Sequence, residues 1–331
     1  LLYKLGYSIK NILLYYTVFF SISILVNVLT IYLTNYIKTK YILILSNILF
    51  CFSYYFLNKM NHNITNLLIF ALINSFSSYM YHSIRHYYAI KHTKLSNSEI
   101  GNIAIYTFIG IIISSYLGPF ITEKYSLSIT LIIMSILSII SIIPLLLIKD
   151  NIVKEHIVNV KIDSARKNFF ILEQSKVLFL LIQPLYLYLY ITNDIKYIGI
   201  FNIINSIASI IIIYYIVRKI NINKYFKYTN ILLIIVLVIK LNIVNKYLTL
   251  LIAFFEGLLI KIYEIVSMKN LYQLKIDNIK SYLIKVEVIF CLTRSIFMLV
   301  SFLAINDIKI ILYILLVFIF LSSFSIKVLE K

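Results

Sequence analysis

Apolar residues along this chain are gathered into eleven segments, which short polar connections separate. Most of the segments contain the roughly 20 residues that an α-helix needs to cross the hydrocarbon of a bilayer, where only a helix or a closed barrel satisfies the backbone. They run over residues 11–34, 41–58, 67–86, 100–121, 126–148, 168–191, 197–217, 228–244, 247–268, 282–304 and 308–326. The pattern predicts an all-α polytopic membrane protein with about eleven transmembrane helices.

Composition agrees with this class. Hydrophobic residues make up 61% of the 331 positions, and mean hydropathy is +0.94. The net charge of +18 comes from basic residues beside apolar segments, so we assign it to lipid headgroups and topology and expect no nucleic-acid partner. Cys51 and Cys291 both fall inside apolar segments, where a thiol packs as a small hydrophobe, so neither a disulfide nor a metal site is expected.

Basic residues are concentrated at every second connection between the segments. Twenty of the 31 Lys and Arg residues lie at one alternate set of connections and ends, and eight lie at the other set. Because Lys and Arg are enriched in cytoplasmic loops, this places the basic loop at 149–167 and the C-terminus in the cytoplasm, in the plasma or inner membrane of the cell. The first residue would then start outside.

The basic loops also recur at an offset near 181 residues. Lys38 matches Lys219, and the end of the fifth segment near Lys149 matches the C-terminus at Lys331. The offset predicts two related halves: an N-terminal bundle over residues 1–148, a basic cytoplasmic loop over 149–167, and a C-terminal bundle over 168–331. The sixth segment has no complete counterpart after Leu1, so we expect twelve helices of which the first is missing from this sequence.

The stretch from Tyr32 to Ser46 resembles the loop between helices two and three of the major facilitator superfamily of secondary transporters. The family has a Gly, an Asp-Arg pair and a Gly-Arg-Arg/Lys run there. Asn35 stands where the Asp is expected, Lys38 where a Gly is expected, and Lys40 keeps the residue type. In the family this loop is a charge-relay latch that stabilises one access state, so these departures put the latch, but not the fold, in question.

A second stretch, Gly110 to Lys124, resembles the Gly-rich motif of helix five that is typical of antiporter branches of that family. Gly110, Ser114 and Gly118 recur every four positions and form one stripe of small residues, on which another helix can approach closely. Pro119 removes a backbone hydrogen bond and lets the helix bend. A plain helix-packing stripe is the alternative interpretation. The basic loop at mid-chain lies where the family joins its two halves.

Charges inside the apolar segments are expensive unless they are paired or face a cavity. The resemblance implies that the helices carrying Lys176, then Glu256 and Lys261, then Glu287 and Arg294 line the central cavity. We interpret Glu264 and Lys285, which lie near the inner boundary, as interface residues.

The positions of the charged residues along their helices predict which of them lie at the same depth in the membrane. Glu256 and Arg294 each lie about ten residues from the outer end of their helices, so at about 1.5 Å per residue they are level near the midplane. Lys261 and Glu287 are level nearer the cytoplasm. We predict a switchable ion pair between Glu256 and Arg294, in which protonation of Glu256 releases Arg294 to a substrate anion or changes the access state. A permanent structural bridge is the alternative.

The sequence gives little indication that the chain is an enzyme. His82, Arg85 and His86 lie at the inner end of the third segment, but a membrane metalloenzyme of the diiron type uses more histidines than the five of this chain. We interpret them as interface residues. We find no phosphate-binding Gly-rich loop or nucleophile elbow, so we expect no enzyme, metal or cofactor.

The resemblance therefore implies transport of a small solute by alternating access. We expect a monomer that uses an ion gradient, with the proton as partner, and we favour export because the helix-five motif resembles antiporters. Two alternatives stay open: a flippase for lipid-linked oligosaccharides, and a membrane protein without transport activity, either one derived from a transporter or a polyprenyl-linked glycan enzyme.

Overall fold

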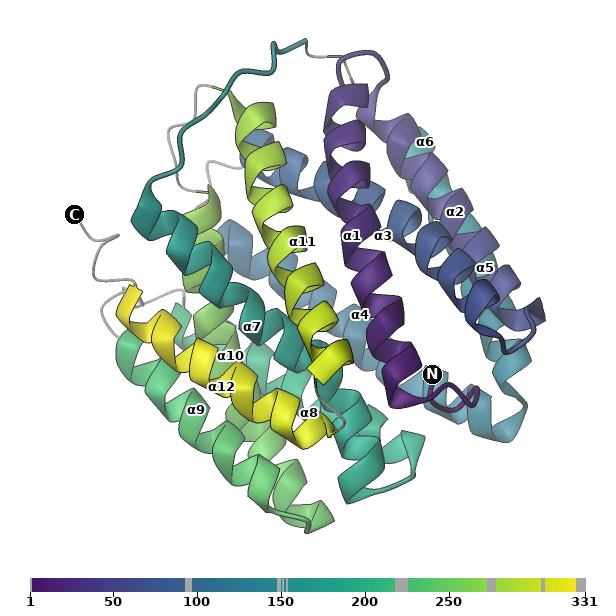
Figure 1. The fold of residues 1–331 in the computed structure, drawn as a ribbon, viewed down its shortest axis with the longest axis vertical. Coiled ribbons are helices and arrows are strands. Elements are labelled where there is room, and N and C mark those ends of the chain that lie inside the picture. The colour runs from purple at the N-terminus through teal and green to yellow at the C-terminus, as the bar shows by residue number, and fades with distance from the viewer. Residues whose placement is uncertain are drawn as a thin grey trace. The chain divides into compact units, whose positions relative to one another are not determined.

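The computed structural model describes residues 2–92, 97–147, 150, 152, 154–217, 226–272, 278–304 and 307–325. In these ranges the regular structure is helical (Figure 1). The helices are α1 (Ile9–Leu33), α2 (Thr39–Lys59), α3 (Ile64–His92), α4 (Asn97–Lys124), α5 (Leu127–Ile140), α6 (Ile142–Leu147), α7 (Ser164–Tyr186), α8 (Ile195–Ile212), α9 (Phe226–Asn242), α10 (Lys246–Tyr272), α11 (Ile279–Ala304) and α12 (Ile308–Ser325).

Every predicted apolar segment is helical, with three local departures. The fifth segment is interrupted at Ser141 and continues as α6, because Pro144 has no N–H to donate to the preceding turn. The helices α7 and α8 each end in a π-helical turn, Leu187–Ile191 after Pro184 and Ile213–Val217.

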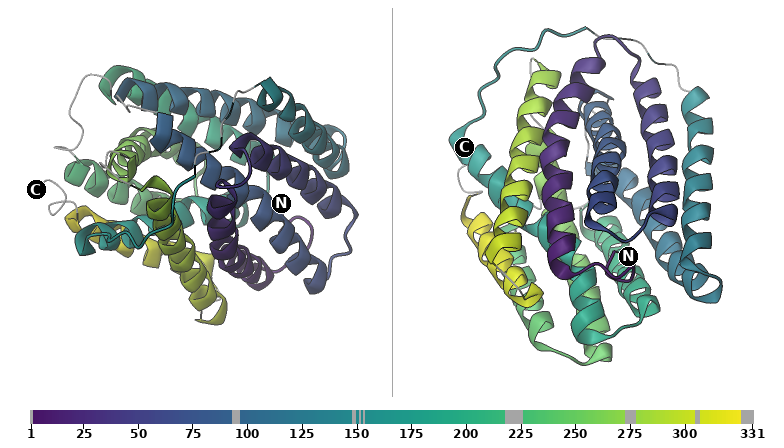
Figure 2. Two further views of the ribbon diagram at one scale, coloured as in Figure 1. Left: turned by 90° about the horizontal axis from the view of Figure 1, so that it is seen from above. Right: turned by 45° about the vertical axis from the view of Figure 1, so that its right-hand side comes forward.

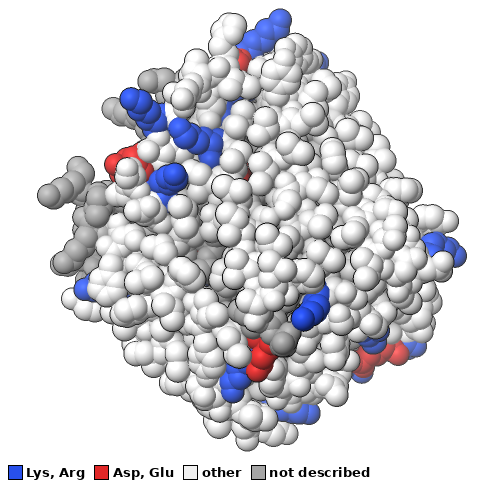
Figure 3. All heavy atoms as spheres, in the orientation of Figure 1, with Lys and Arg blue, Asp and Glu red and all other residues white. Residues whose placement is uncertain are grey.

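Nine helices in the described ranges are long and apolar enough to cross a membrane. The other two predicted spans are α9, which has 17 residues, and α10, which carries Glu256, Lys261 and Glu264. Figure 3 shows one face of the molecule on which most side chains are neither basic nor acidic. These features are those of a multi-pass membrane protein, and the crossing of α9 and α10 stays a prediction.

The chain forms two compact units, and the first comprises Leu1–His92, Tyr125–Ile162 and Ile276–Asn306. In unit 1, α1 packs along both α3 and α11, and α2 packs along α3 and α5 (Figure 1 and Figure 2). Small buried hydroxyls let α1 and α3 approach closely, since Ser23 and Ser75 lie with their Oγ atoms 2.9 Å apart.

Unit 2 comprises Thr93–Lys124, Asp163–Lys275 and Asp307–Lys331. In this unit α8 packs along α4 and α10, and α12 packs along α7 and α9. Two glycines make the contacts of α8 close: a Cβ atom on Gly199 would lie 2.3 Å from the carbonyl oxygen of Ser115 in α4, and one on Gly257 of α10 would lie 2.2 Å from that of Asn205. Only a residue without a side chain fits at these two positions.

The two units do not follow the predicted division into residues 1–148 and 168–331. Helix α4 precedes the mid-chain segment but belongs to unit 2, because Gly199 lets it pack on α8. Helix α11 follows that segment but belongs to unit 1, because it packs along α1 and α3. Lys149, Lys219 and Lys331, on which the predicted repeat and orientation depend, lie outside the described residues.

Candidate functional site

Polar side chains from α1, α3 and α11 meet inside unit 1. Asn27 of α1 donates through Nδ2 to Sγ of Cys291 in α11, at 3.2 Å, and it accepts a hydrogen bond from Ser83 of α3. All three side chains are fully buried. Because a buried amide is costly without partners, these bonds fix the alignment of the three helices.

Arg294 lies near the middle of α11, on the side of the helix that carries Cys291. Its Nη1 donates to the phenolic oxygen of Tyr79 in α3 at 3.0 Å. The guanidinium carbon is 5.6 Å from the ring centroid of Phe20 and 5.8 Å from that of Phe290, within the range of cation–π attraction. Aromatic groups from α1, α3 and α11 therefore lie against this cation.

Glu287 lies one turn before Cys291 and two turns before Arg294 on α11. Its Oε1 is 3.7 Å from Nε2 of His86, which is too long for a hydrogen bond. The side chain is buried, and its Oε1 has no hydrogen-bond partner among the described residues. Unit 1 thus holds a buried carboxylate whose Oε1 has no hydrogen-bond donor among the described residues. It lies near an imidazole, the side chain whose ordinary pKa is closest to neutral pH.

Unit 2 contains a fully buried ion pair between α9 and α10. Nζ of Lys240 is 2.7 Å from Oε2 of Glu256, and neither side chain has exposed surface. The ammonium also lies 4.9 Å from the ring centroid of Phe179 and 5.6 Å from that of Phe201. Both charges are compensated inside the unit.

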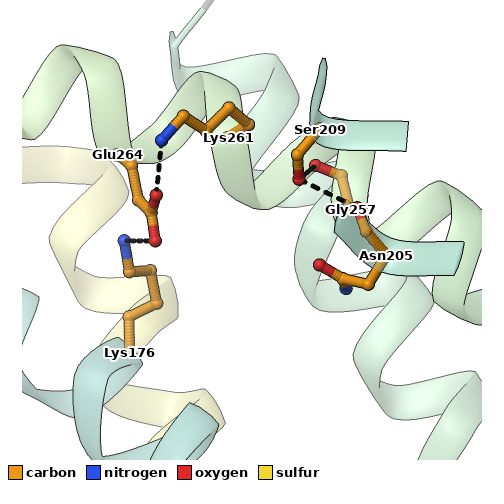
Figure 4. Close-up of polar contacts among 6 residues, drawn as sticks. All are labelled: Lys176, Asn205, Ser209, Gly257, Lys261 and Glu264. Carbon is orange, nitrogen blue, oxygen red and sulfur yellow. Dashed lines mark hydrogen bonds and ion pairs between the residues drawn. The ribbon is translucent and has the colours of Figure 1, made fainter. Parts of the chain in front are cut away.

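A second charged cluster of unit 2 joins α7 to α10 (Figure 4). Glu264 receives two ammonium groups: Nζ of Lys261 is 3.0 Å from its Oε2, and Nζ of Lys176 is 3.6 Å from its Oε1. Each lysine also lies over an aromatic ring, Lys261 at 4.6 Å from the centroid of Phe108 and Lys176 at 4.5 Å from that of Tyr263. Lys176 and Lys261 are buried and Glu264 is partly exposed, so this cluster reaches the surface of the unit through the carboxylate.

The predicted pairing of Glu256 with Arg294 is not the one that the structure gives. Glu256 pairs with Lys240, which lies buried inside α9. Arg294 bonds to Tyr79. Lys261 and Glu287, expected at one level, belong to different units, and a cavity role for Lys176 and these four residues stays a prediction.

Glu264 and Lys285, whose interface roles stay predictions, have partners within their units. Glu264 binds two buried lysines, because α7 and α10 bring them to it. Nζ of Lys285 donates to the carbonyl oxygen of Val160 at 2.7 Å, so it is anchored to the mid-chain segment. In the sequence, such buried charged residues can be recognised as a single charge inside an apolar segment, and Lys240 is another example.

The helix-five stripe does not make the close helix contact that was expected of it. A Cβ atom on Gly110 or Gly118 would meet nothing within 4 Å among the described residues, and Ser114 is exposed. Helix α8 instead approaches Ser115 and Pro119, which lie on a different side of α4. The packing interpretation and the family-motif interpretation of these positions both stay predictions.

The other motif residues lie at the join of α1 and α2. Asn35 hydrogen-bonds to the mid-chain segment, and the backbone N–H of Lys40 donates to Asp150. Lys38 is the N-cap of α2, with no side-chain capping bond. Among the described residues no group of three or more His, Cys, Asp or Glu is arranged to hold a metal ion.

Comparison with known proteins gives a fold and no sequence relative. No family model matches the chain, and no curated protein matches it by sequence. A mutant of the nucleoside transporter NupG superposes with a TM-score of 0.66 at 14% identity, covering 99% of this chain and 92% of that one. The human organic anion transporter MFSD10 (TETRAN) does so with a TM-score of 0.66 at 11% identity, covering 95% of this chain and 83% of that one.

The chain has the fold of major facilitator transporters. The resemblance that the loop at Asn35 and the helix at Gly110 suggested is thereby confirmed at the level of the fold, although both motifs are degenerate.

Proposed function

We propose that this chain carries a small solute across a membrane by alternating access, with proton movement as the driving force and Glu287 as the group that takes up the proton. The proposed proton coupling rests on one observation, the surroundings of the Glu287 carboxylate. Its Oε1 is buried and has no hydrogen-bond donor among the described residues, and the imidazole of His86 lies 3.7 Å away.

Glu287 replaces Glu256 as the coupling group for a physical reason. Protonation of Glu256 would leave the ammonium of Lys240 charged and fully buried without its counter-ion, which is strongly unfavourable. Protonation of Glu287 removes a buried charge, and because its Oε1 has no hydrogen-bond partner among the described residues, it breaks no hydrogen bond at that atom. An intramembrane carboxylate of this kind is a candidate for a proton relay by default.

An anionic solute fits the surroundings of Arg294. Its guanidinium, a planar group of several donors, contacts the phenol of Tyr79 and lies near the rings of Phe20 and Phe290. Guanidinium groups recognise carboxylate and phosphate oxygens through paired hydrogen bonds. The names of the two similar structures include one nucleoside and one organic anion transporter; the arginine favours the anion for this chain.

Export is the direction that we propose, on the resemblance of Gly110–Lys124 to antiporter branches alone. The orientation with the C-terminus in the cytoplasm, the monomeric state and the proton as coupling ion are proposals as well.

Uptake into proteoliposomes tests the function. The protein is reconstituted and offered radiolabelled uridine, uridine monophosphate, benzoate and benzamide, with and without an imposed proton gradient. We expect gradient-dependent accumulation of the anionic member of each matched pair. Accumulation of neither pair above empty liposomes would contradict transport of these classes and favour a flippase or a protein without transport activity.

A further inference from the structure

Two buried lysines of unit 2, which come from different helices, share one carboxylate. Glu264 of α10 directs Oε2 to Nζ of Lys261 at 3.0 Å and Oε1 to Nζ of Lys176 in α7 at 3.6 Å (Figure 4). The second distance is longer than that of a hydrogen bond, so the two ammonium groups are held unequally. One oxyanion thus links α7 to α10.

Aromatic rings hold the same two ammonium groups from other directions. Nζ of Lys261 lies 4.6 Å from the ring centroid of Phe108 in α4, and Nζ of Lys176 lies 4.5 Å from that of Tyr263 in α10. A ring face attracts the positive charge, and each ammonium has three N–H donors with which to bind an oxyanion. The rings therefore position the lysines for the carboxylate of Glu264.

The carboxylate is the exposed part of this cluster. The Glu264 side chain keeps 27% of its surface, whereas each of the two lysines keeps 4%. The other buried pair of unit 2 is different, because Lys240 and Glu256 both keep 0%. The pair at Lys240 is sealed, whereas the side of the cluster that carries Glu264 is the one from which another oxyanion can reach the lysines.

The charges of the cluster favour replacement of Glu264 over addition of a second anion. Glu173, about one turn before Lys176 on α7, lies within electrostatic range of that ammonium. Two lysines and two glutamates carry no net charge together, so an added anion would leave an excess negative charge inside an apolar segment. When Glu264 turns away, one positive charge is uncompensated, and a monoanion balances it.

We propose that Lys176 and Lys261 form a binding site for a carboxylate or phosphate group, in which Glu264 is a built-in competitor that the ligand displaces. Two oxygens of the ligand take the places of the two Glu264 oxygens, so an oxyanion fits the site better than a halide does. The site lies in unit 2, whereas Arg294 lies in unit 1, and binding there requires no transport. A soluble anion and a lipid headgroup can both supply this oxyanion.

Thermal unfolding of the full chain in detergent tests the site, with inorganic phosphate titrated against chloride at constant ionic strength. All variants are made on an Arg294→Gln parent, so that the guanidinium of unit 1 does not contribute. Glu264→Gln should lower the unfolding midpoint without phosphate, because two buried ammonium groups lose their carboxylate. It should also raise the affinity for phosphate roughly tenfold, the equivalent of one hydrogen bond to a charged group, and phosphate should restore the midpoint by mass action.

Glu123→Gln is the matched control. Glu123 pairs with Lys196 at 2.5 Å, but the Lys196 side chain is 52% exposed, so loss of this carboxylate leaves no buried charge. This variant should keep the parent's midpoint and phosphate affinity. Lys176→Met added to Glu264→Gln should remove the gain in affinity. Equal phosphate affinities in Glu264→Gln and Glu123→Gln would overturn the site.

Glu264→Asp keeps the test decisive if the neutral variant does not fold. Aspartate retains the negative charge but is one methylene shorter, so it cannot span both ammonium groups. Its phosphate affinity should lie between those of the parent and of Glu264→Gln. A phosphate affinity equal to the parent's in the aspartate variant would overturn Glu264 as a competitor.

Lipid distinguishes the two sources of the oxyanion. Phosphatidylglycerol presents a phosphate monoanion in a headgroup, and phosphatidylcholine, the control, carries no net charge. Stabilisation of Glu264→Gln by inorganic phosphate assigns the site to a soluble anion, and stabilisation by phosphatidylglycerol alone assigns it to a headgroup. A response to neither would overturn the proposal. Because these measurements do not use transport, absence of flux in the wild-type protein would contradict the proposed function and not this site.

Discussion

Lys240 and Glu256 form a buried ion pair in which Nζ lies 2.7 Å from Oε2 and neither side chain reaches the surface. The two residues come from neighbouring helices, α9 and α10, so the pair also fixes the contact between them. A carboxylate held in this way is a structural element. We therefore propose Glu287, whose Oε1 has no hydrogen-bond partner among the described residues of unit 1, as the coupling group in place of Glu256.

Removal of one partner of this pair should destabilise the protein severely. Glu256→Gln or Lys240→Met leaves one buried charge uncompensated, which costs about 3–5 kcal/mol. The double variant Lys240→Met with Glu256→Leu removes both charges and should recover most of that loss. Thermal unfolding of the purified protein in detergent checks this, and a double variant no more stable than either single one would contradict it.

Two glycines of unit 2 should not tolerate a methyl group. Gly199→Ala and Gly257→Ala would each place a Cβ atom within 2.3 Å of a backbone oxygen, so a helix must shift. We expect a large loss of folded protein, measured as the yield of monodisperse material. Gly110→Ala is the matched control: nothing described lies within 4 Å of its Cβ, so it should be neutral or stabilising by up to about 1 kcal/mol. Equal losses at Gly110 and Gly199 would refute the close packing of α4 on α8.

Arg294 should decide between charged and neutral solutes. Arg294→Gln removes the guanidinium, and because a hydrogen bond to a charged group contributes about 1.5–3 kcal/mol, affinity for an anion should fall roughly 10- to 100-fold. Arg294→Lys keeps the charge but not the planar donor, so it should recover only part of the affinity. Binding of uridine monophosphate and of uridine, measured by isothermal titration calorimetry, separates these effects. An unchanged affinity for the phosphate in Arg294→Gln would remove Arg294 from the site.

The helices could be predicted from sequence because the cost of an unsatisfied backbone in lipid leaves helices as the simplest way for apolar segments to cross. The segment expected at 41–58 is α2 (Thr39–Lys59), and the one expected at 247–268 is the core of α10 (Lys246–Tyr272). The break at Ser141 was not predicted, although Pro144 marks it. The grouping of α4 with α8 could not be predicted, because it depends on a glycine in one helix meeting the backbone of another.

The candidate site, like the fold, could be predicted from the sequence only in part. Charged residues such as Glu287 and Arg294 stand out in sequence, since a charge inside an apolar segment is costly wherever the segment lies. Their neighbours do not, because Tyr79 comes to lie against Arg294, and His86 near Glu287, only through helix packing. Asn35 is an example of what the sequence does not show. That Asn35 replaces the Asp of the family pattern can be read from the sequence, but its hydrogen bonds to Glu155 and Lys280 cannot.

Solute exchange, compared with gradient-driven accumulation in the Glu287→Gln variant, tests whether Glu287 is the coupling group. A neutral amide cannot carry a proton, so the variant should still exchange labelled for unlabelled uridine monophosphate across the liposome membrane but should not accumulate it in response to a proton gradient. Glu123→Gln is the control, because Glu123 pairs with the exposed Lys196 at 2.5 Å in unit 2. This variant should accumulate uridine monophosphate normally. Gradient-driven accumulation by Glu287→Gln at the wild-type level would contradict Glu287 as the coupling group.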